Sequence, residues 1–223
     1  MKTKCLTFRL LTLLILGMTA LTSCSKDDDI QPEETFDINN LAGYFLYYES
    51  SNFNSIYPYR RIYLLEFTSG KICKRYSVFG EDFYPYTIEE GNIINTGFTQ
   101  FLLDGDSILD INNKYKEINL IKVPESNQLA GKIFGGTYYL ANMSVLHPNF
   151  FYSFAAEGYK LDAGFIIGTT QRIQNYTPIG NVAARSELDN GDTEFMVLVN
   201  GKLEVNYKVK DVGGNHYGTF EEQ

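Results

Sequence analysis

Hydrophobic and polar residues alternate with a period of two along much of the chain. The clearest run is 202–210, where leucine, valine and tyrosine at the odd positions alternate with lysine, glutamate and asparagine at the even ones. A period of two places neighbouring side chains on opposite faces of a β-strand, so we expect one buried and one solvated face. No stretch after residue 40 sustains a helical period. The pattern therefore predicts an antiparallel all-β protein, with at most a short helix in a connection.

Turn-forming dipeptides separate these segments about every ten residues, as expected for short strands joined by hairpins. They are Ser69-Gly70, Glu90-Gly91-Asn92, Asp104-Gly105, Glu157-Gly158, Asn190-Gly191 and Asn200-Gly201. Glycine and asparagine adopt the positive φ angles of tight hairpin turns at low cost. The spacing thus predicts many short strands connected in sequence order.

The first 24 residues depart from this pattern. A basic start (Lys2, Lys4, Arg9) precedes an apolar run over 10–21 and a cysteine, Cys24, that follows leucine, threonine and serine. The apolar run is about a dozen residues long, whereas a bilayer core needs ~20. The segment resembles the signal peptide and lipobox of bacterial lipoproteins.

This resemblance implies that residues 1–23 are removed and that Cys24 is the lipidation site, with a diacylglyceryl group on its thiol and a third acyl chain on its amine. Burial of acyl chains contributes about 0.8 kcal/mol per methylene, so an anchor with several chains attaches a protein stably to a membrane. The alternative is an ordinary secretory signal in which Cys24 is incidental.

Residues 24–38 are predicted to form an acidic linker. The run Ser25-Lys26-Asp27-Asp28-Asp29 follows the cysteine, and Gln31-Pro32-Glu33-Glu34 continues the polar composition. The acidic cluster resembles the surface-export signal of Bacteroidetes lipoproteins, which implies an outer-membrane protein that faces the cell surface. A plain solvated linker is the alternative.

The remainder of the chain is strongly acidic. Residues 1–23 contain three of the 19 basic residues and none of the 27 acidic ones, which leaves a formal net charge of −11. Binding to nucleic acid requires clustered lysine and arginine. The pairs Arg60-Arg61 and Lys74-Arg75 do not extend into such a patch, so we expect no nucleic-acid partner.

Three short segments recur in the same order in the two halves of the chain, about 90 residues apart, which is too long for a solenoid unit. The matches are 39–43 with 127–131, 63–70 with 150–158, and 102–105 with 198–201. They predict an internal duplication with one β-barrel-like domain over 39–124 and a second over 125–223. Each is large enough for its own core.

The start of the first copy resembles the lipocalin-like domains of Bacteroidetes lipoproteins. The residues that carry the resemblance are Leu41, Gly43, Tyr44, Phe67 and Gly70. The resemblance covers residues 39–123, although the chain lacks the tryptophan that usually follows the glycine. It implies two small lipocalin-like antiparallel barrels in tandem. One larger barrel or a β-sandwich is the alternative.

Candidate catalytic residues are few. The two histidines, His147 and His216, lie beside turn-forming residues, so we place both in turns with no reason to be close. Cys73 is the one cysteine left besides the anchor, and a cysteine in a strand is usually a small buried hydrophobe; a nucleophile activated by its basic neighbours is the alternative. Glu66 is expected on the outer face of its strand, with a glycoside-hydrolysing acid in a pocket as the alternative.

Carboxylates gather around two predicted turns, and oxygen ligands of this kind suit calcium. The groups are Asp104, Asp106 and Asp110, and Asp189, Asn190 and Asp192. Hairpin turns require aspartate and asparagine for their own geometry. We therefore predict no catalytic residue, no metal site and no cofactor.

Aromatic residues flank two prolines, in Tyr57-Pro58-Tyr59 and Tyr84-Pro85-Tyr86. Proline is confined to strand starts, edges and turns, which places these tyrosines near a barrel mouth. There they can bind a ligand through a flat face and a hydroxyl, or else cap the core.

These expectations favour a non-catalytic protein, anchored to the membrane by lipid, that binds a small apolar or glycan ligand. A structural or interaction subunit of an envelope complex is the first alternative, with another envelope protein as its partner. A glycan hydrolase is the second.

Overall fold

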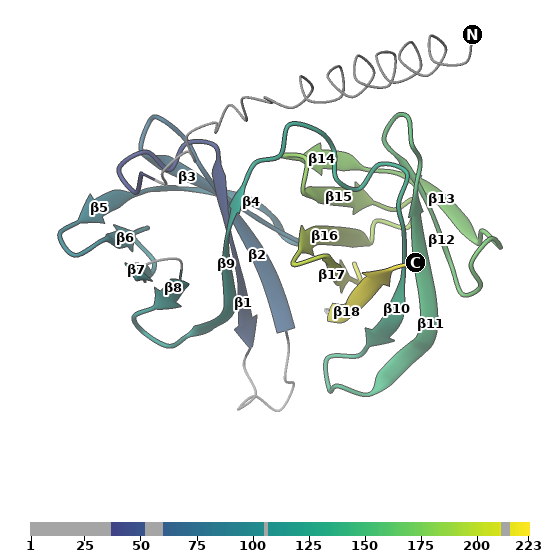
Figure 1. Ribbon diagram of the computed structural model, residues 1–223. Helices are drawn as coiled ribbons and strands as arrows, with labels where there is room; N and C mark the ends of the chain where they lie inside the picture. Colours follow the sequence, from purple (N-terminus) through teal and green to yellow (C-terminus); the bar gives the residue numbers. More distant parts are fainter. Residues whose placement is uncertain (1–36, 52–59, 105–106, 211–214) are drawn as a thin grey trace, which may run out of the picture. The chain divides into compact units, whose positions relative to one another are not determined.

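The computed structural model describes residues 37–51, 60–104, 107–210 and 215–223 (Figure 1). The predicted lipidation site Cys24, the tyrosines Tyr57 and Tyr59, and Asp106 lie outside these ranges. Within them, no helix is long and apolar enough to cross a membrane.

The described residues form eighteen strands, and every pairing between them is antiparallel. The all-β antiparallel prediction is therefore confirmed. In the first half the strands are β1 (Tyr44–Ser51), β2 (Arg60–Phe67), β3 (Ile72–Ser77), β4 (Gly80–Pro85), β5 (Thr87–Glu89), β6 (Ile93–Asn95), β7 (Gln100–Asp104), β8 (Ser107–Asp110) and β9 (Tyr115–Lys122). In the second half they are β10 (Ile133–Tyr139), β11 (Val145–Phe154), β12 (Lys160–Gly164), β13 (Arg172–Asn175), β14 (Thr177–Ile179), β15 (Ala183–Glu187), β16 (Thr193–Val199), β17 (Lys202–Lys208) and β18 (Asn215–Glu222).

The second half is a nearly closed barrel with the strand order β13-β12-β11-β10-β18-β17-β16-β15-β14. The first half consists of a five-stranded sheet, β4-β3-β2-β1-β9, and a four-stranded sheet, β5-β6-β7-β8. Strands β8 and β9 lie side by side. Counted from the first strand of each half, the two halves therefore share one strand order.

Both halves bend at a tyrosine between two strands. A single residue, Tyr176, separates β13, which pairs with β12, from β14, which pairs with β15, so one bent segment brings the two ends of the barrel sheet together. Tyr86 stands in the same place between β4 and β5. Its amide donates to Lys71 O at 2.9 Å, as that of Tyr176 donates to Tyr159 O at 2.9 Å. The bend is thus the same in both halves.

The segments that match in sequence occupy matching places. Leu41 and Leu129 are both fully buried, and Gly43 and Gly131 both have a positive φ, of 87° and 74°. Glycine adopts this conformation without the penalty of a Cβ atom. The third sequence match, 102–105 with 198–201, differs by one residue from the equivalence that the strand pairing gives.

The register error concerns the hairpins β7–β8 and β16–β17, which are equivalent. Asp104 pairs with Ser107 and Val199 pairs with Lys202, so Asp104 corresponds to Val199 and not to Asn200. The sequence match paired similar residue types across two turns that differ by one position.

Among the residues that the structure describes, apolar side chains form three clusters. The first-half core contains Leu41, Leu46, Tyr48, Leu65, Phe67, Cys73, Tyr86, Ile94, Phe101, Leu103 and Ile108. The second-half core contains Leu129, Phe134, Tyr138, Tyr152, Phe154, Leu161, Ala163, Tyr176, Ala184, Met196, Leu203, Val205 and Phe220. The junction cluster joins the halves and contains Phe45, Tyr47, Ile62, Leu64, Tyr76, Val78, Ile179, Val182, Ala183, Phe195, Val197 and Val199.

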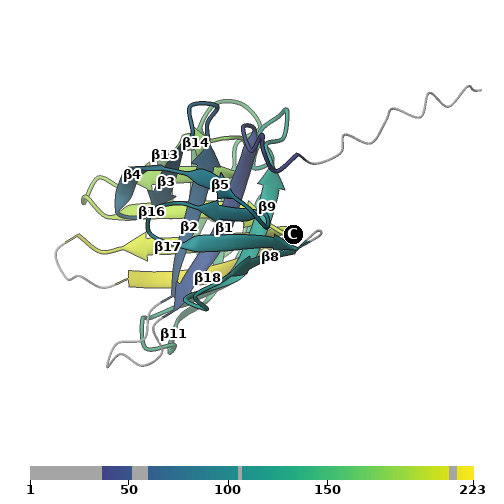
Figure 2. The ribbon, with the colours of Figure 1, turned by 90° about the vertical axis from the view of Figure 1, so that its left-hand side faces the viewer.

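The junction buries the outer faces of β1–β3 and β14–β16, whose strands cross in Figure 2. It also changes the expectation for β17, where a solvated face was predicted. Glu204 and Asn206 on that face are only 7% and 1% exposed. The Asn206 side chain accepts from Ile62 N at 2.7 Å and donates to Arg60 O at 3.1 Å. It therefore satisfies backbone groups of β2 that a neighbouring strand would otherwise satisfy.

Candidate ligand-binding site

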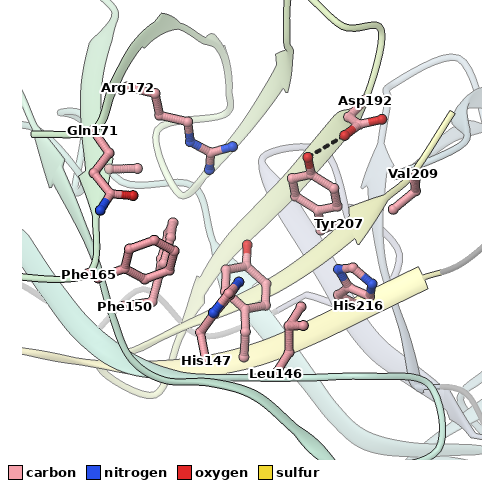
Figure 3. Close-up of a pocket in the computed structure, with 12 residues that line it drawn as sticks. Leu146, His147, Phe150, Phe165, Gln171, Arg172, Asp192, Tyr207, Val209 and His216 are labelled. Atoms are coloured by element: carbon pink, nitrogen blue, oxygen red, sulfur yellow. Dashed lines mark hydrogen bonds between the residues drawn. The ribbon is translucent and has the colours of Figure 1, made fainter.

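A cavity of about 450 Å³ opens in the second half (Figure 3). Side chains from β10, β11, β12, β13, β17 and β18, together with the loops beside them, line it. Pockets of roughly 300–1,000 Å³ bind drug-sized molecules. The cavity is therefore large enough for a small organic ligand.

Aromatic rings form two opposite walls of this cavity. On one wall the rings of Phe150 and Phe165 lie edge to face with centroids 5.5 Å apart, and His147 lies 4.6 Å from Phe165. On the other wall His216 stacks on Tyr207 at 5.6 Å, with 12° between the ring planes. Figure 3 shows the space between these walls. Such walls suit a flat apolar group.

A buried carboxylate lies behind the lining residues Tyr138 and Arg172. Glu194, on β16, has no exposed surface. It accepts from Tyr152 Oη at 2.6 Å, from Tyr138 Oη at 3.3 Å and from Gln174 Nε2 at 2.5 Å, and it forms an ion pair with Arg172. Every partner donates to Glu194, so its negative charge is satisfied within the protein.

Burial and electrostatics fix the protonation of these donors. Burial, and next the charge of Glu194, raise the pKa of Tyr138 and of Tyr152 well above the usual value. For Arg172, burial acts to lower the pKa, but the attraction of Glu194 outweighs it and the pKa is raised. The two hydroxyls and the guanidinium therefore stay protonated.

Asp192 is held in a second hydrogen-bonded group at the cavity wall. Tyr207 donates its hydroxyl to Asp192, Lys210 N donates to Oδ1 at 2.9 Å, and Asn190 Nδ2 donates to Oδ2 at 2.8 Å. Burial tends to raise the pKa of Asp192, but these hydrogen bonds lower it overall. For His216, burial and then the charge of nearby His147 lower the pKa, against the attraction of Asp192.

The structure corrects the prediction for the histidines. His147 lies in β11 and His216 in β18, not in turns, and the cavity brings them together. Prolines and glycines near the two residues suggested turns. However, β11 continues through Pro148 with an irregular register to β10 beside His147, and β18 already begins at Asn215, the residue before His216. In β18, His216 lies four residues before the buried Phe220 and therefore on the same face of the strand.

The predicted tyrosines within the described ranges lie in the first half. Tyr86 is buried in the first-half core, where its ring meets Phe67 edge to face at 5.0 Å. Tyr84 packs on Phe98 at 4.7 Å. Neither lines the second-half cavity. Their role in ligand binding, like that of Tyr57 and Tyr59, stays a prediction.

Cys73 and Glu66 are placed as their simpler interpretations predicted. Cys73 is fully buried in the first-half core, and burial raises its pKa to about 11. Glu66 lies on the face opposite Leu65 and Phe67, where it accepts from Tyr76 Oη at 2.5 Å.

Asp110, one of the carboxylates near the predicted turns, holds the turn that follows β8. Asp110 accepts from Thr99 Oγ1 at 3.0 Å, Asn112 N at 3.2 Å and Tyr115 N at 3.0 Å, and also from Lys114 N. Among the residues described, no group of three or more histidine, cysteine, aspartate or glutamate side chains is placed to hold a metal ion.

A second cleft, of about 490 Å³, lies at the junction and contains two carboxylates, Glu49 and Glu204. Paired carboxylates of this kind are the machinery of glycoside hydrolases. Both, however, form ion pairs with Nη2 of Arg60, at 2.9 Å for Glu204, and Arg60 Nη1 donates to Thr219 at 3.0 Å. Burial raises the pKa of Glu204. The guanidinium occupies the space between the carboxylates, so the group joins the two halves.

Comparisons of this chain with models of protein families, with curated proteins and with solved structures found no match.

Proposed function

We propose that this protein is a lipid-anchored, lipocalin-like binding protein of the bacterial outer membrane that holds a small ligand in the second-half cavity. The observation that carries the proposal is the cavity itself, with aromatic walls and a few polar groups that converge on it. This combination is typical of ligand sites, since apolar walls supply affinity and placed polar groups fix orientation. The nearly closed antiparallel barrel supports the lipocalin-like assignment.

The proposed location rests on the sequence of residues 1–38, with its lipobox cysteine and acidic linker. Radiolabelled palmitate should join the protein and should fail to join a Cys24→Ala variant. Protease treatment of intact cells should degrade the protein if it faces outward. A protein that resists protease in intact cells but not in lysed cells would place it on the inner side of the membrane.

The binding function is tested by native mass spectrometry of the protein purified from its own host. We expect an added mass of a few hundred daltons that disappears on denaturation, in line with the size class of such cavities. A clean apo mass in gentle conditions would count against retention of a ligand.

One observation favours an interaction subunit as the second candidate. The loop between β12 and β13 exposes three consecutive large apolar side chains, Phe165, Ile166 and Ile167, at 38%, 67% and 51%. Exposed apolar patches mark contact sites when they are contiguous. Cross-linking in cells from cysteines placed at 166 and 167 would capture an envelope partner if this candidate holds, and would give no adduct otherwise.

A further inference from the structure

The carboxylate oxygens at the cavity already accept hydrogen bonds from the protein. Both oxygens of Asp192 accept from Tyr207, Lys210 and Asn190. Both oxygens of Glu194 accept from the tyrosines, Gln174 and Arg172. A ligand that offers only donors would therefore compete with bonds that the protein already makes.

Several hydrogen-bond donors of the cavity, by contrast, have no partner within the described part of the protein. Arg172 donates a hydrogen bond from Nη2 to Glu194, while its buried Nε has no hydrogen-bond partner. In the part of the chain that the structure describes, the side chains of His147, His216 and Gln171 make no hydrogen bond to the protein, although all three line the cavity. Imidazole, amide and guanidinium groups all donate hydrogen bonds, and a guanidinium can only donate. The amide and the neutral imidazoles can also accept, so it is the Arg172 guanidinium, which can only donate, that requires an acceptor atom from the ligand.

The walls define the rest of the ligand. The Arg172 guanidinium lies 5.6 Å from the Phe150 ring centroid and 5.9 Å from that of Tyr207, so it reaches between the two walls. In Figure 3 it points into the space that Phe150, Phe165 and Tyr207 surround. A flat ring between the walls would bring an acidic substituent towards the guanidinium and the histidines.

From this geometry we infer that the cavity selects a small organic anion with a flat apolar ring, such as an aromatic carboxylate or sulfonate, and binds it more tightly in mild acid. The inference rests on the proposed binding function and names the class of its ligand.

The pH dependence follows from the charges that face the histidines. Arg172 on β13 and Asp192 in the loop before β16 line the cavity with them, and Glu194 on β16 lies behind Arg172. Tyr138 and Tyr207 also line it, but their raised pKa values keep both hydroxyls neutral. Arg172 and Glu194 balance, so Asp192 leaves the site with a charge of −1 when both histidines are neutral. Protonation of His216 removes this negative charge, which favours an anion.

The coupling between proton binding and anion binding gives the direction in which the affinity changes with pH. Burial lowers the pKa of His216 in the free protein, and a bound anion would raise it again because it stabilises the imidazolium. Anion binding therefore takes up protons, and affinity must rise as pH falls. One coupled proton changes affinity by about tenfold per pH unit over the range in which it titrates.

The test compares two matched fluorescent probes, 8-anilinonaphthalene-1-sulfonate, which is an anion, and N-phenyl-1-naphthylamine, which lacks the sulfonate. We expect the anion to bind about tenfold more tightly at about pH 5.5 than at about pH 8. The neutral probe should change by less than about twofold. Calorimetry in buffers of different ionisation enthalpy should show proton uptake with the anion alone.

Variants assign the effect to the site. His147→Asn and His216→Asn together should abolish most of the pH dependence. Lys132→Gln serves as the control, because it removes an exposed cation that pairs with Glu222 outside the cavity. Circular dichroism at both pH values verifies that the fold is unchanged.

The outcomes separate the two proposals. Equal, pH-independent binding of both probes would overturn the anion inference and leave the binding function standing. Binding of neither probe at either pH would count against the cavity as a site for flat apolar ligands, and so against both.

Discussion

The two halves share one strand order but differ in the residue at one equivalent position that faces the interior. In the first half, Arg75 on β3 pairs with Leu65 and Asp82 of the neighbouring strands. In the second half, Ala163 holds the same register position, opposite Tyr152 and Arg172. In the second half the arginine, Arg172, lies on the neighbouring strand, and the methyl group of Ala163 occupies the position that Arg75 has in the first half.

This exchange explains why the second half is hollow there. The Arg75 guanidinium lies 5.3 Å from the centroid of Tyr63, 5.0 Å from that of Tyr84 and 5.1 Å from that of Phe98, so it packs among three rings. Ala163 instead lines the cavity. The side chain at this one position therefore distinguishes a packed interior from one with a cavity.

The largest effect should come from removing Glu194, because the second half depends on this fully buried carboxylate to satisfy several buried donors. Glu194→Ala leaves a guanidinium and two buried hydroxyls without their acceptor, and should lower the free energy of unfolding by about 3 kcal/mol. Urea denaturation measures it. Glu222→Ala, which breaks an exposed pair with Lys132, should cost less than about 1 kcal/mol. Equal losses in the two variants would contradict the account.

A smaller loss should follow when the contact between the halves is weakened. Asn206→Ala leaves Ile62 N and Arg60 O without their side-chain partner at the junction. Each unsatisfied buried backbone group costs about 1–3 kcal/mol, and we expect about 2 kcal/mol in total after relaxation. Asn149→Ala, at an exposed position of β11, is the control. A stability unchanged by Asn206→Ala would show that the junction does not depend on this side chain.

Exchange of the two residues that distinguish the interiors should alter binding only in the half that contains the cavity. Ala163→Arg places a large side chain in the cavity and should weaken the binding of N-phenyl-1-naphthylamine at least tenfold, which corresponds to about 1.4 kcal/mol. Arg75→Ala, its counterpart in the first half, should leave the affinity within about twofold. Fluorescence titration measures both variants. If Arg75→Ala weakened binding as much as Ala163→Arg, the site would not lie in the second half.

The smallest effect concerns the reactivity of the Cys73 thiol in the first-half core, because this test leaves the free energy of unfolding unchanged. Burial raises the pKa of Cys73 to about 11, and only the thiolate is nucleophilic. Its reaction with a thiol reagent at about pH 8 should therefore be about a hundredfold slower in the native protein than in urea. Rapid labelling of the native protein would mean that this core is open to solvent.

Much of the fold could be predicted from local patterns. Alternation and turn dipeptides gave the strands and hairpins, and the repeated leucine and glycine around 41–43 and 129–131 anticipated the shared strand order. The buried polar face of β17 could not be predicted, because Glu204 and Asn206 are buried only by contact with β2 of the other half. Alternation describes one strand and carries no information about its distant neighbours.

The site was largely missed for the same reason. Arg172, Glu194 and the histidines come from strands that are far apart in sequence, and an irregular register beside His147 broke its alternation. One signal was available. Glu194 precedes an unbroken apolar run and alternates with Met196, which faces the second-half core, so its carboxylate had to be buried.

The central claim is that a ligand enters the second half and not the first. A crystal structure of the protein with bound N-phenyl-1-naphthylamine tests it most directly. The account predicts one molecule between the ring wall of Phe150 and Phe165 and that of Tyr207 and His216. A molecule seated among Tyr63, Tyr84 and Phe98 of the first half, with the second-half cavity empty, would contradict it.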